Sequence, residues 1–193
     1  MMTSNTNKTI ASIFLGLRTR FIHQILWKNK ENAEFVISHV DKAMIAVIQR
    51  TSEATVTINN KEKSRIAQGL LILLGITHSD GPEDVEWLSK KICNMRIFGD
   101  VEGKMNLSVK DINGELLVVS QFTLQSSTQK GNRPSFIEAA RPELAEPLYQ
   151  EFIKACASET GKTILTGEFG ADMKVALIND GPVTIIIDSK NRK

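Results

Sequence analysis

Residues 114–124 read GELLVVSQFTL, which is the longest strand candidate in the chain. Strand alternation sends side chains to two opposite faces. One face would carry Leu116, Val118, Ser120, Phe122 and Leu124, and the other Leu117, Val119, Gln121 and Thr123. The polar residues gather at the end of an apolar strand, where each would cost roughly 1–3 kcal/mol if buried without a hydrogen bond. They either bond neighbouring backbone or form the polar floor of a pocket, and the residues alone leave both interpretations open.

Short apolar runs and one helical pattern precede this stretch. Alternation and turn residues predict strands at 44–50, 53–58 and 62–67, a turn at 59–61, and a continuously apolar strand, buried on both faces, at 69–77. After Gly81-Pro82, apolar residues recur every three or four positions, which predicts an amphipathic helix over 82–95.

The C-terminal part repeats this mixture. Residues 125–135 are polar and contain glycine and proline, so we expect a long exposed loop. A period of four predicts a helix over 142–160, and three further strands are expected at 162–169, 173–178 and 183–188. Between the last two stands NDGPVT (179–184), a hairpin turn signal with an unusual proline, because Pro182 gives up a strand N–H.

The order of these elements predicts the fold class. Hairpins dominate, and the two helices stand singly between groups of strands. We therefore expect an α/β (α+β) protein whose mixed or antiparallel sheet closes toward a β-barrel, with two outer helices.

Charge divides the 193-residue chain into a leader (1–43) and a body (44–193). The leader has a formal charge of +3 and the body −1, so the body shows no bulk basic signal for nucleic acid. We expect the leader to lie outside the fold, either as an upstream extension before Met44 or as a targeting segment. The expected location is the cytoplasm, with organelle targeting by residues 1–43 as the alternative.

Several kinds of chemistry lack the residues they need. Cys93 and Cys156 form no metal or redox spacing, so we expect buried, reduced thiols. His78 is the only histidine of the body, which leaves no multi-histidine metal site, and neither a P-loop nor GxGxxG occurs. We expect no metal and no cofactor.

Two strings identify a family when they stand together: SQFTL at 120–124 and NDGPVT at 179–184. With QR at 49–50, KGNRPSF at 130–136 and TGEFGADM at 166–173, they make 44–193 resemble the D-aminoacyl-tRNA deacylase (D-Tyr-tRNA(Tyr) deacylase) family, whose fold we expect here. The chain departs from the family pattern at Gln125-Ser126, on the expected pocket rim, and at Ile45.

The resemblance implies a homodimeric hydrolase that cleaves the ester of D-aminoacyl-tRNA, accepts glycine mischarged on tRNA, rejects L-aminoacyl-tRNA and so proofreads chirality in translation. It places Ser120, Gln121, Phe122 and Thr123 in the pocket. It also implies that Gly181 and Pro182, joined by a cis peptide bond, enter the partner subunit's pocket, and that Arg50 braces them.

The body offers no strong base, and Thr123 has no Lys or His beside it in sequence. A threonine nucleophile needs such a neighbour. We therefore expect backbone N–H groups near Phe122 and Thr123 to form an oxyanion hole, assisted by the 2′-hydroxyl of the tRNA. An acyl-enzyme on Thr123 is the alternative.

Contacts to tRNA should involve its backbone, because many tRNAs must be accepted. Lys130 and Arg133 are the candidates, with Lys90 and Lys91 better explained as solvated charges. Two rival functions remain: an esterase using Ser120 or Thr123 with His78, and a dimeric RNA-binding module without catalysis.

Overall fold

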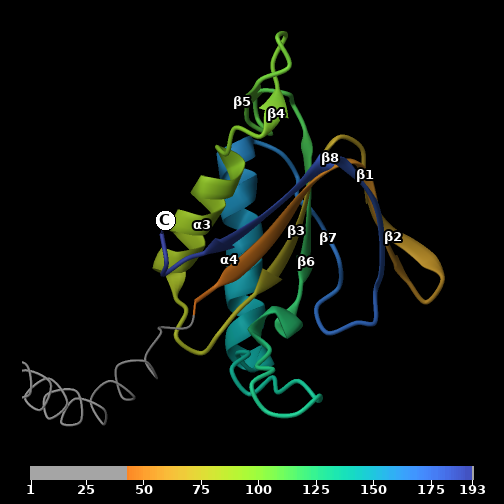
Figure 1. Ribbon diagram of the computed structural model, residues 1–193. Helices are drawn as coiled ribbons and strands as arrows, with labels where there is room; N and C mark the ends of the chain where they lie inside the picture. The colour runs from red at the N-terminus through yellow and green to blue at the C-terminus, as the bar shows by residue number, and fades with distance from the viewer. Residues whose placement is uncertain (1–42, 193) are drawn as a thin grey trace, which may run out of the picture. The chain divides into compact units, whose positions relative to one another are not determined.

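The computed structural model describes residues 43–192, so the leader assigned to 1–43 lies outside the described residues apart from Ala43. Figure 1 shows a strongly curved sheet with helices against one side. In chain order the elements are β1 (Ile45–Ile58), β2 (Lys61–Ile66), β3 (Gly69–Gly75), α3 (Pro82–Cys93), β4 (Phe98–Gly99), β5 (Met105–Leu107), β6 (Glu115–Ser120), the 3₁₀ helix η1 (Phe122–Gln125), α4 (Pro142–Thr160), β7 (Leu165–Thr166) and β8 (Lys174–Asp188).

The main sheet has the strand order β2-β1-β3-β6-β7, and β8 pairs with β1. The β3–β6 and β6–β7 pairs are parallel, whereas β1 is antiparallel to β2, β3 and β8. The Ser64 hydroxyl on β2 donates to the Thr166 carbonyl on β7 at 2.6 Å, which links the two ends of the strand order. The sheet is thus mixed and nearly closed, with two helices outside, as expected from the sequence.

Two apolar cores hold this arrangement. Between the sheet and the helices lies the larger core, to which α3 contributes Leu88 and Ile92 and α4 contributes Tyr149 and Phe152. The smaller core fills the curve of the sheet; its buried members are Ala54, Val56, Ile66, Leu71, Leu117 and Val119. Alternate residues of one strand face the two cores, which is why β3 is buried on both faces.

The strands at 44–50 and 53–58 are one continuous strand, β1, because its first half pairs with β3 and its second half with β2. Those at 173–178 and 183–188 likewise form the single strand β8, which pairs with both halves of β1. The expected hairpin turn at 179–184 is therefore wrong. The strand at 162–169 shrinks to β7, and the loop after α3 contains the short β4–β5 hairpin.

The long strand predicted at 114–124 ends at Ser120, and the chain turns into η1. Close packing explains the change, since η1 lies against the end of β3: a Cβ on Gly75 would meet Leu124 Cβ at 2.8 Å and the Gln121 carbonyl oxygen at 3.1 Å. The predicted alternation consequently fails for Phe122, Thr123 and Leu124.

The helix at 142–160 is confirmed, and that at 82–95 ends at Cys93. Cys93 and Cys156 are free and buried, as predicted. Among the described residues, no helix combines the length and hydropathy needed to cross a membrane.

Candidate functional site

A cleft of about 560 Å³ opens where β6 passes into η1, a volume typical of small-molecule sites. Its lining comes from three regions, namely the β6–η1 junction, the loop before α4, and the segment from Phe169 to β8. The lining residues are Val119, Ser120, Gln121, Phe122, Phe136, Ala139, Ala140, Pro142, Phe169, Gly170, Ala171, Met173 and Val175. Three of the four predicted pocket residues thus line one cleft, and Thr123 is next to them in η1.

The start of η1 presents backbone donors beside this cleft. The Gln121 N–H donates to the Leu74 carbonyl at 2.8 Å, and the Leu124 N–H donates back to Gln121 at 3.2 Å. Within residues 43–192, the N–H groups of Phe122 and Thr123 donate to no backbone or side-chain acceptor. Their position at the first turn of a helix explains this, because the intrahelical acceptors begin only after it.

The Thr123 hydroxyl accepts a hydrogen bond from the Gln121 side-chain amide at 2.5 Å. In the part of the chain that the structure describes, no basic side chain bonds this hydroxyl. His78 is exposed and does not line the cleft. The geometry therefore provides neither the histidine of a triad nor a base for a threonine nucleophile.

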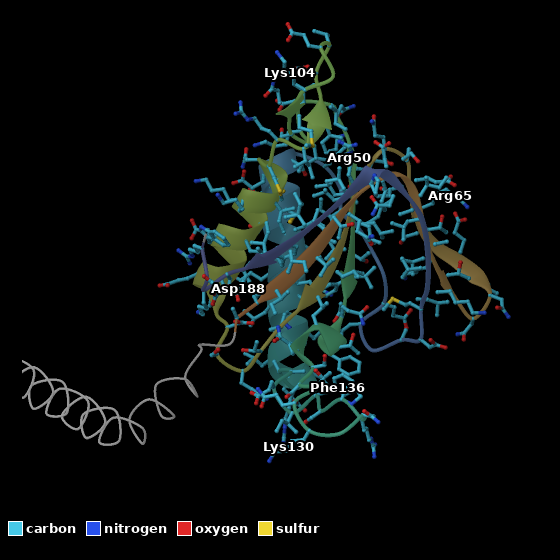
Figure 2. All side chains as sticks on the ribbon, viewed as in Figure 1. Arg50, Arg65, Lys104, Lys130, Phe136 and Asp188 are labelled. Carbon is cyan, nitrogen blue, oxygen red and sulfur yellow. The ribbon has the colours of Figure 1, made fainter. Side chains whose placement is uncertain are left out.

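The outer rim of the cleft is aromatic. Phe122 is 56% exposed, and its ring meets that of Phe136 edge-on with centroids 5.1 Å apart. Phe136 directly follows the long loop predicted at 125–135, in which Ser127 and Ser135 exchange backbone hydrogen bonds of 2.8 and 2.9 Å. Lys130 lies exposed in the same loop, near Phe136 (Figure 2), as does Arg133.

Gln125 is a residue whose role the sequence did not reveal. Its side chain is buried and its amide nitrogen donates to the carbonyls of Ala43 at 2.9 Å and Gly75 at 3.1 Å. It therefore fixes η1 to the end of β3. The sequence marked this position only as a departure from the family pattern, which suggested a changed pocket rim. It did not suggest that Gln125 holds η1 in place.

At the other end of the sheet, β8 bulges away from β1. Gln49 pairs with Thr184 and Thr51 with Asn179, so the single residue Arg50 faces the four residues 180–183. The Asn179 side chain spans this bulge, accepting from the Val183 N–H at 3.0 Å and donating to the Thr184 hydroxyl at 2.9 Å. A bulge of this kind changes the direction of the backbone without ending the strand.

Arg50 braces the bulge from inside. Its Nε donates to the Asp180 carbonyl at 3.0 Å and lies 3.2 Å from the Asp180 carboxylate, while another guanidinium nitrogen donates to the Ile97 carbonyl at 2.5 Å. The guanidinium carbon also lies 6.0 Å from the centroid of the Phe98 ring. These contacts agree with the bracing role that the resemblance implied.

The expected cis bond between Gly181 and Pro182 is wrong, because no peptide bond among the described residues is cis. Gly181 instead has φ +118°, a region that L side chains rarely adopt, and this dihedral redirects the chain. A Cβ on Gly181 would also lie 2.5 Å from an Arg50 nitrogen. Gly181 and Pro182 are both exposed.

The bulge and the cleft of one chain do not meet. Arg50 pairs with Leu70, which pairs with Leu116, whereas the cleft begins around Ser120 on the same strand. Four residues of strand separate the two by about 13 Å along the sheet. Figure 2 shows the same separation, with Arg50 near the top of the view and Phe136 near the bottom.

Residues 43–192 contain no group of three or more His, Cys, Asp or Glu residues that could hold a metal ion. The candidate site therefore consists of the cleft, the backbone donors of η1, and the braced bulge.

Comparisons with known proteins identify the family of this chain. The family model described as D-Tyr-tRNA(Tyr) deacylase matches residues 47–188. The D-aminoacyl-tRNA deacylase of Cytophaga hutchinsonii is 69% identical over 150 residues, which are 78% of this chain and 100% of that protein. The protein of the same name from Flavobacterium psychrophilum is 64% identical with the same coverage.

Two solved structures share the fold. The c-Myc DNA unwinding element binding protein matches with a TM-score of 0.72 at 42% identity, over 75% of this chain and 98% of that one. A probable eukaryotic D-amino acid tRNA deacylase matches with a TM-score of 0.66 at 16% identity, over 76% of this chain and 99% of that one. The braced bulge and the cleft at the β6–η1 junction lie within a family match that spans most of the chain, and this protein belongs to the D-Tyr-tRNA(Tyr) deacylase family.

Proposed function

We propose that this protein hydrolyses the ester of D-aminoacyl-tRNA through backbone catalysis at the β6–η1 junction, with L-aminoacyl-tRNA excluded by the Gly181–Pro182 bulge of a partner subunit. Deacylation as such follows from membership of a family of ester hydrolases. The observation that carries the mechanism is the pair of unengaged N–H groups at Phe122 and Thr123, which lies beside the cleft.

These two N–H groups serve as the oxyanion hole. The ester carbonyl of the substrate develops negative charge when water attacks, and fixed donors stabilise that charge without reorganising. A single donor of this kind typically contributes about 10²–10³-fold in rate. The ester is activated, so no side-chain nucleophile is needed, and the tRNA's 2′-hydroxyl helps to orient the water.

The Gly181–Pro182 gate operates across a homodimer. Gly181 and Pro182 are exposed and lie outside the β1 pairing register, so their carbonyls can reach a ligand instead of a strand. Because roughly 13 Å of sheet separates them from their own cleft, we assign them to the cleft of a second copy. A rigid backbone wall rejects an L-residue by collision, whatever its side chain is.

The same gate explains why glycine mischarged on tRNA would be accepted. Glycine has no side chain to collide with the wall, so glycine mischarged on tRNA enters like a D-residue. The enzyme would thereby remove D-amino acids and misplaced glycine from tRNA, a form of chiral proofreading in translation. We place this activity in the cytoplasm; a reporter fused to residues 1–43 that entered an organelle would contradict that location.

Lys130 and Arg133 belong to the loop that also supplies Phe136 to the cleft. We assign them to phosphates near the 3′ end of the tRNA. Within the described residues neither forms a salt bridge, so both charges are available to phosphates. Charge reversal at both positions should weaken tRNA binding and flatten its salt dependence.

The decisive assay compares hydrolysis of D-Tyr-tRNA and L-Tyr-tRNA by the unmutated protein and by Pro182→Ala. We expect hydrolysis of the D-ester only, with selectivity reduced by the substitution. Equal rates on both enantiomers by the unmutated protein would contradict the proposal, and tRNA binding without release of amino acid would identify a binding module instead.

Thr123→Ala separates backbone from side-chain catalysis. The substitution leaves the N–H of residue 123 in place, so the rate should fall by less than about tenfold. A loss near the 10⁶-fold seen when a covalent nucleophile is removed would show that the hydroxyl attacks. Efficient hydrolysis of small tRNA-free esters, abolished by His78→Ala, would favour the esterase alternative.

A further inference from the structure

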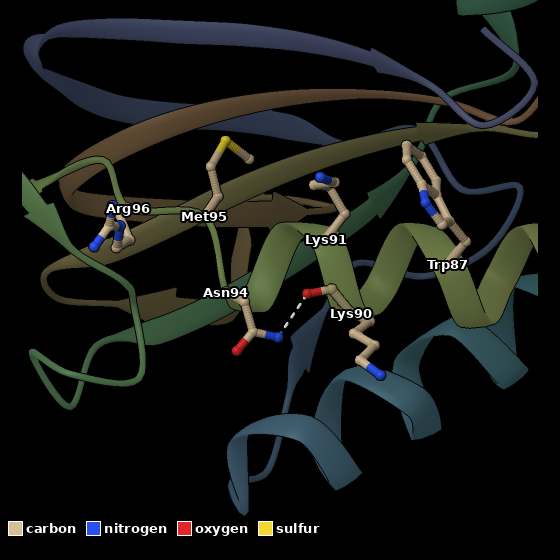
Figure 3. Close-up of a pocket in the computed structure, with 6 residues that line it drawn as sticks. All are labelled: Trp87, Lys90, Lys91, Asn94, Met95 and Arg96. Carbon is tan, nitrogen blue, oxygen red and sulfur yellow. Dashed lines mark hydrogen bonds between the residues drawn. The ribbon is translucent and has the colours of Figure 1, made fainter. Parts of the chain in front are cut away.

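A basic hollow of about 500 Å³ lies at the C-terminal end of α3 (Figure 3), on a part of the molecule that the proposed mechanism does not use. Its lining residues are Trp87, Lys90, Lys91, Asn94, Met95 and Arg96. Trp87 and Lys91 also line a second hollow of about 360 Å³, which continues over β8 residues 185–188. We call the two together the Trp87 groove.

The cations of this groove form no ion pair among the described residues. Among residues 43–192, Lys90, Lys91 and Arg96 have no carboxylate within 4.0 Å, whereas Lys104, Lys110 and Lys190 are each ion-paired. Arg96 interacts at longer range with Asp111, whose pKa is lowered mainly by hydrogen bonds from Ser108 and further by the charges of Lys110 and Arg96.

Two carboxylates border the groove, but other groups engage them. Glu159 lies 3.7 Å from Lys110 Nζ and accepts a hydrogen bond from Asn94 at 3.3 Å. Asp188 accepts the N–H groups of Lys190 and Asn191 at 2.9 and 2.8 Å. The groove therefore presents positive charge to any ligand.

The wall between the two hollows is aromatic. Trp87 and Lys91, four residues apart, rise on the same side of α3, while Lys90 projects from another side (Figure 3). The indole ring has Lys91 Nζ at 5.7 Å and the Arg192 guanidinium carbon at 4.8 Å from its centroid. The two cations at the face of this half-buried ring add positive charge where the two hollows meet.

The groove adjoins the gate. Arg96 directly precedes Ile97, whose carbonyl binds Arg50, and Phe98 lies beneath the same guanidinium. The end of α3 and the bulge of β8 thus lie at one end of the subunit, away from η1 (Figure 1). If the gate enters the partner's cleft, the groove next to it comes to lie beside that cleft.

We propose that the Trp87 groove of one subunit binds the phosphate backbone of the acceptor stem of a tRNA whose aminoacyl end occupies the partner's cleft. This inference rests on the dimer of the proposed function. Contacts to phosphates alone suit an enzyme that must accept many tRNAs, because they carry no sequence information. The tRNA is then held from two sides, by Lys130 and Arg133 of one subunit and by the groove of the other.

A structural explanation competes for two of these residues. Lys90 and Lys91 stand in the last turn of α3, where a positive charge stabilises the helix through its dipole. Arg96 lies beyond the helix and gains little from this effect. Stability and tRNA affinity therefore have to be measured on the same variants.

The test compares two triple variants that lose the same charge. The groove variant carries Lys90→Ala, Lys91→Ala and Arg96→Ala; the control carries Lys61→Ala, Lys63→Ala and Lys154→Ala, at exposed lysines without ion pairs in the described chain. Both are assayed on D-Tyr-tRNA and on 3′-O-(D-tyrosyl)adenosine, which has no stem, with thermal unfolding to verify the fold.

We expect the groove variant to raise KM for D-Tyr-tRNA about tenfold or more at 0.1 M salt, with kcat unchanged. Its plot of log affinity against log salt should be shallower by roughly 2–3, since each lost phosphate contact removes up to about 0.9 from the slope. The adenosine ester should be hydrolysed at the unmutated rate. An unchanged KM and slope, or an equal loss in the control variant, would overturn the proposal, while failure of the unmutated protein to act on D-Tyr-tRNA would overturn the proposed function instead.

Mixed dimers test the cross-subunit placement. Ala171→Trp fills the cleft of the subunit that carries it. A dimer of one cleft-filled subunit and one groove-variant subunit should retain a low KM, because its open cleft is served by an intact groove. A dimer of a doubly altered subunit with an unmutated one should show the raised KM. The opposite pattern would place the groove and the cleft it serves in the same subunit.

Discussion

The two ends of the sheet present backbone to solvent in opposite ways. At the cleft end, β6 stops at Ser120 and η1 leaves N–H groups facing a hollow. At the bulge end, β8 continues through Gly181 and Pro182, and Arg50 supports the bulge by donating to the Asp180 carbonyl. One end has a cleft with two unengaged N–H groups beside it, and the other exposes Gly181 and Pro182.

At each end, one polar side chain binds two backbone carbonyls that are distant from it in sequence. Gln125 connects η1 to Ala43 and Gly75, and Arg50 connects Asp180 in the bulge to Ile97. Each half of the proposed site is thus fixed within one chain, at a position where it does not meet the other half.

The largest effect on activity should come from Gly181→Ala at the bulge end. At φ +118° the new Cβ would be strained and would collide with Arg50, shifting the gate. We expect hydrolysis of D-Tyr-tRNA to fall by about 10². Gly103→Ala, which also has positive φ but open space around it, is the control and should retain full activity.

At the cleft end, Gln125→Leu should destabilise the protein by about 3 kcal/mol. The carbonyls of Ala43 and Gly75 would stay buried without the amide that they now accept from. Urea unfolding measures the loss, with the exposed Gln129→Leu as the matched control. A loss below 1 kcal/mol would mean that η1 is anchored by packing alone.

The cleft end should also carry a pH dependence. Asp80 follows β3, and burial raises its pKa to about 6, opposed by the Thr77 N–H and reinforced by the charge of Asp84, with Lys190 acting weakly against the rise. Because the folded state holds this proton longer than the unfolded state, stability should fall by up to about 3 kcal/mol as pH rises from about 4 to 6.

Asp80→Asn tests this dependence, since the amide oxygen can still accept the Thr77 N–H that Asp80 Oδ2 accepts at 2.7 Å. The free energy of unfolding of the variant should stay constant between about pH 4 and 6, whereas that of the unmutated protein should fall. Identical pH profiles of unfolding for the two proteins would mean that a group other than Asp80 causes the pH dependence.

The smallest effect is expected from Arg50→Lys, which keeps the charge but not the forked geometry. A lysine cannot bind Asp180 and Ile97 together, so the gate should loosen and stability should fall by about 1 kcal/mol. Chiral selectivity between D- and L-Tyr-tRNA should drop several-fold. Arg65→Lys, at an exposed ion pair, should change neither quantity.

Much of the fold could be predicted because its signals are local. The period of Leu144, Leu148, Phe152 and Cys156 predicted α4, and the apolar run of β3 predicted a strand buried on both faces. Strand continuity was missed because it depends on partners: β1 passes unbroken through polar residues 51–53 because β3, β2 and β8 pair with it around them.

The site divides in the same way. The chain's own residues marked two unusual segments, because SQFT interrupts an apolar strand and NDGP places glycine and proline where a strand N–H is lost. Only the tertiary structure decided that SQFT turns into a helix, that the peptide bond before Pro182 is trans, and that the two segments lie at opposite ends of the sheet. Residue type limits what a backbone segment can do, but its direction and its distance from other segments are set by packing against strands that are remote in sequence.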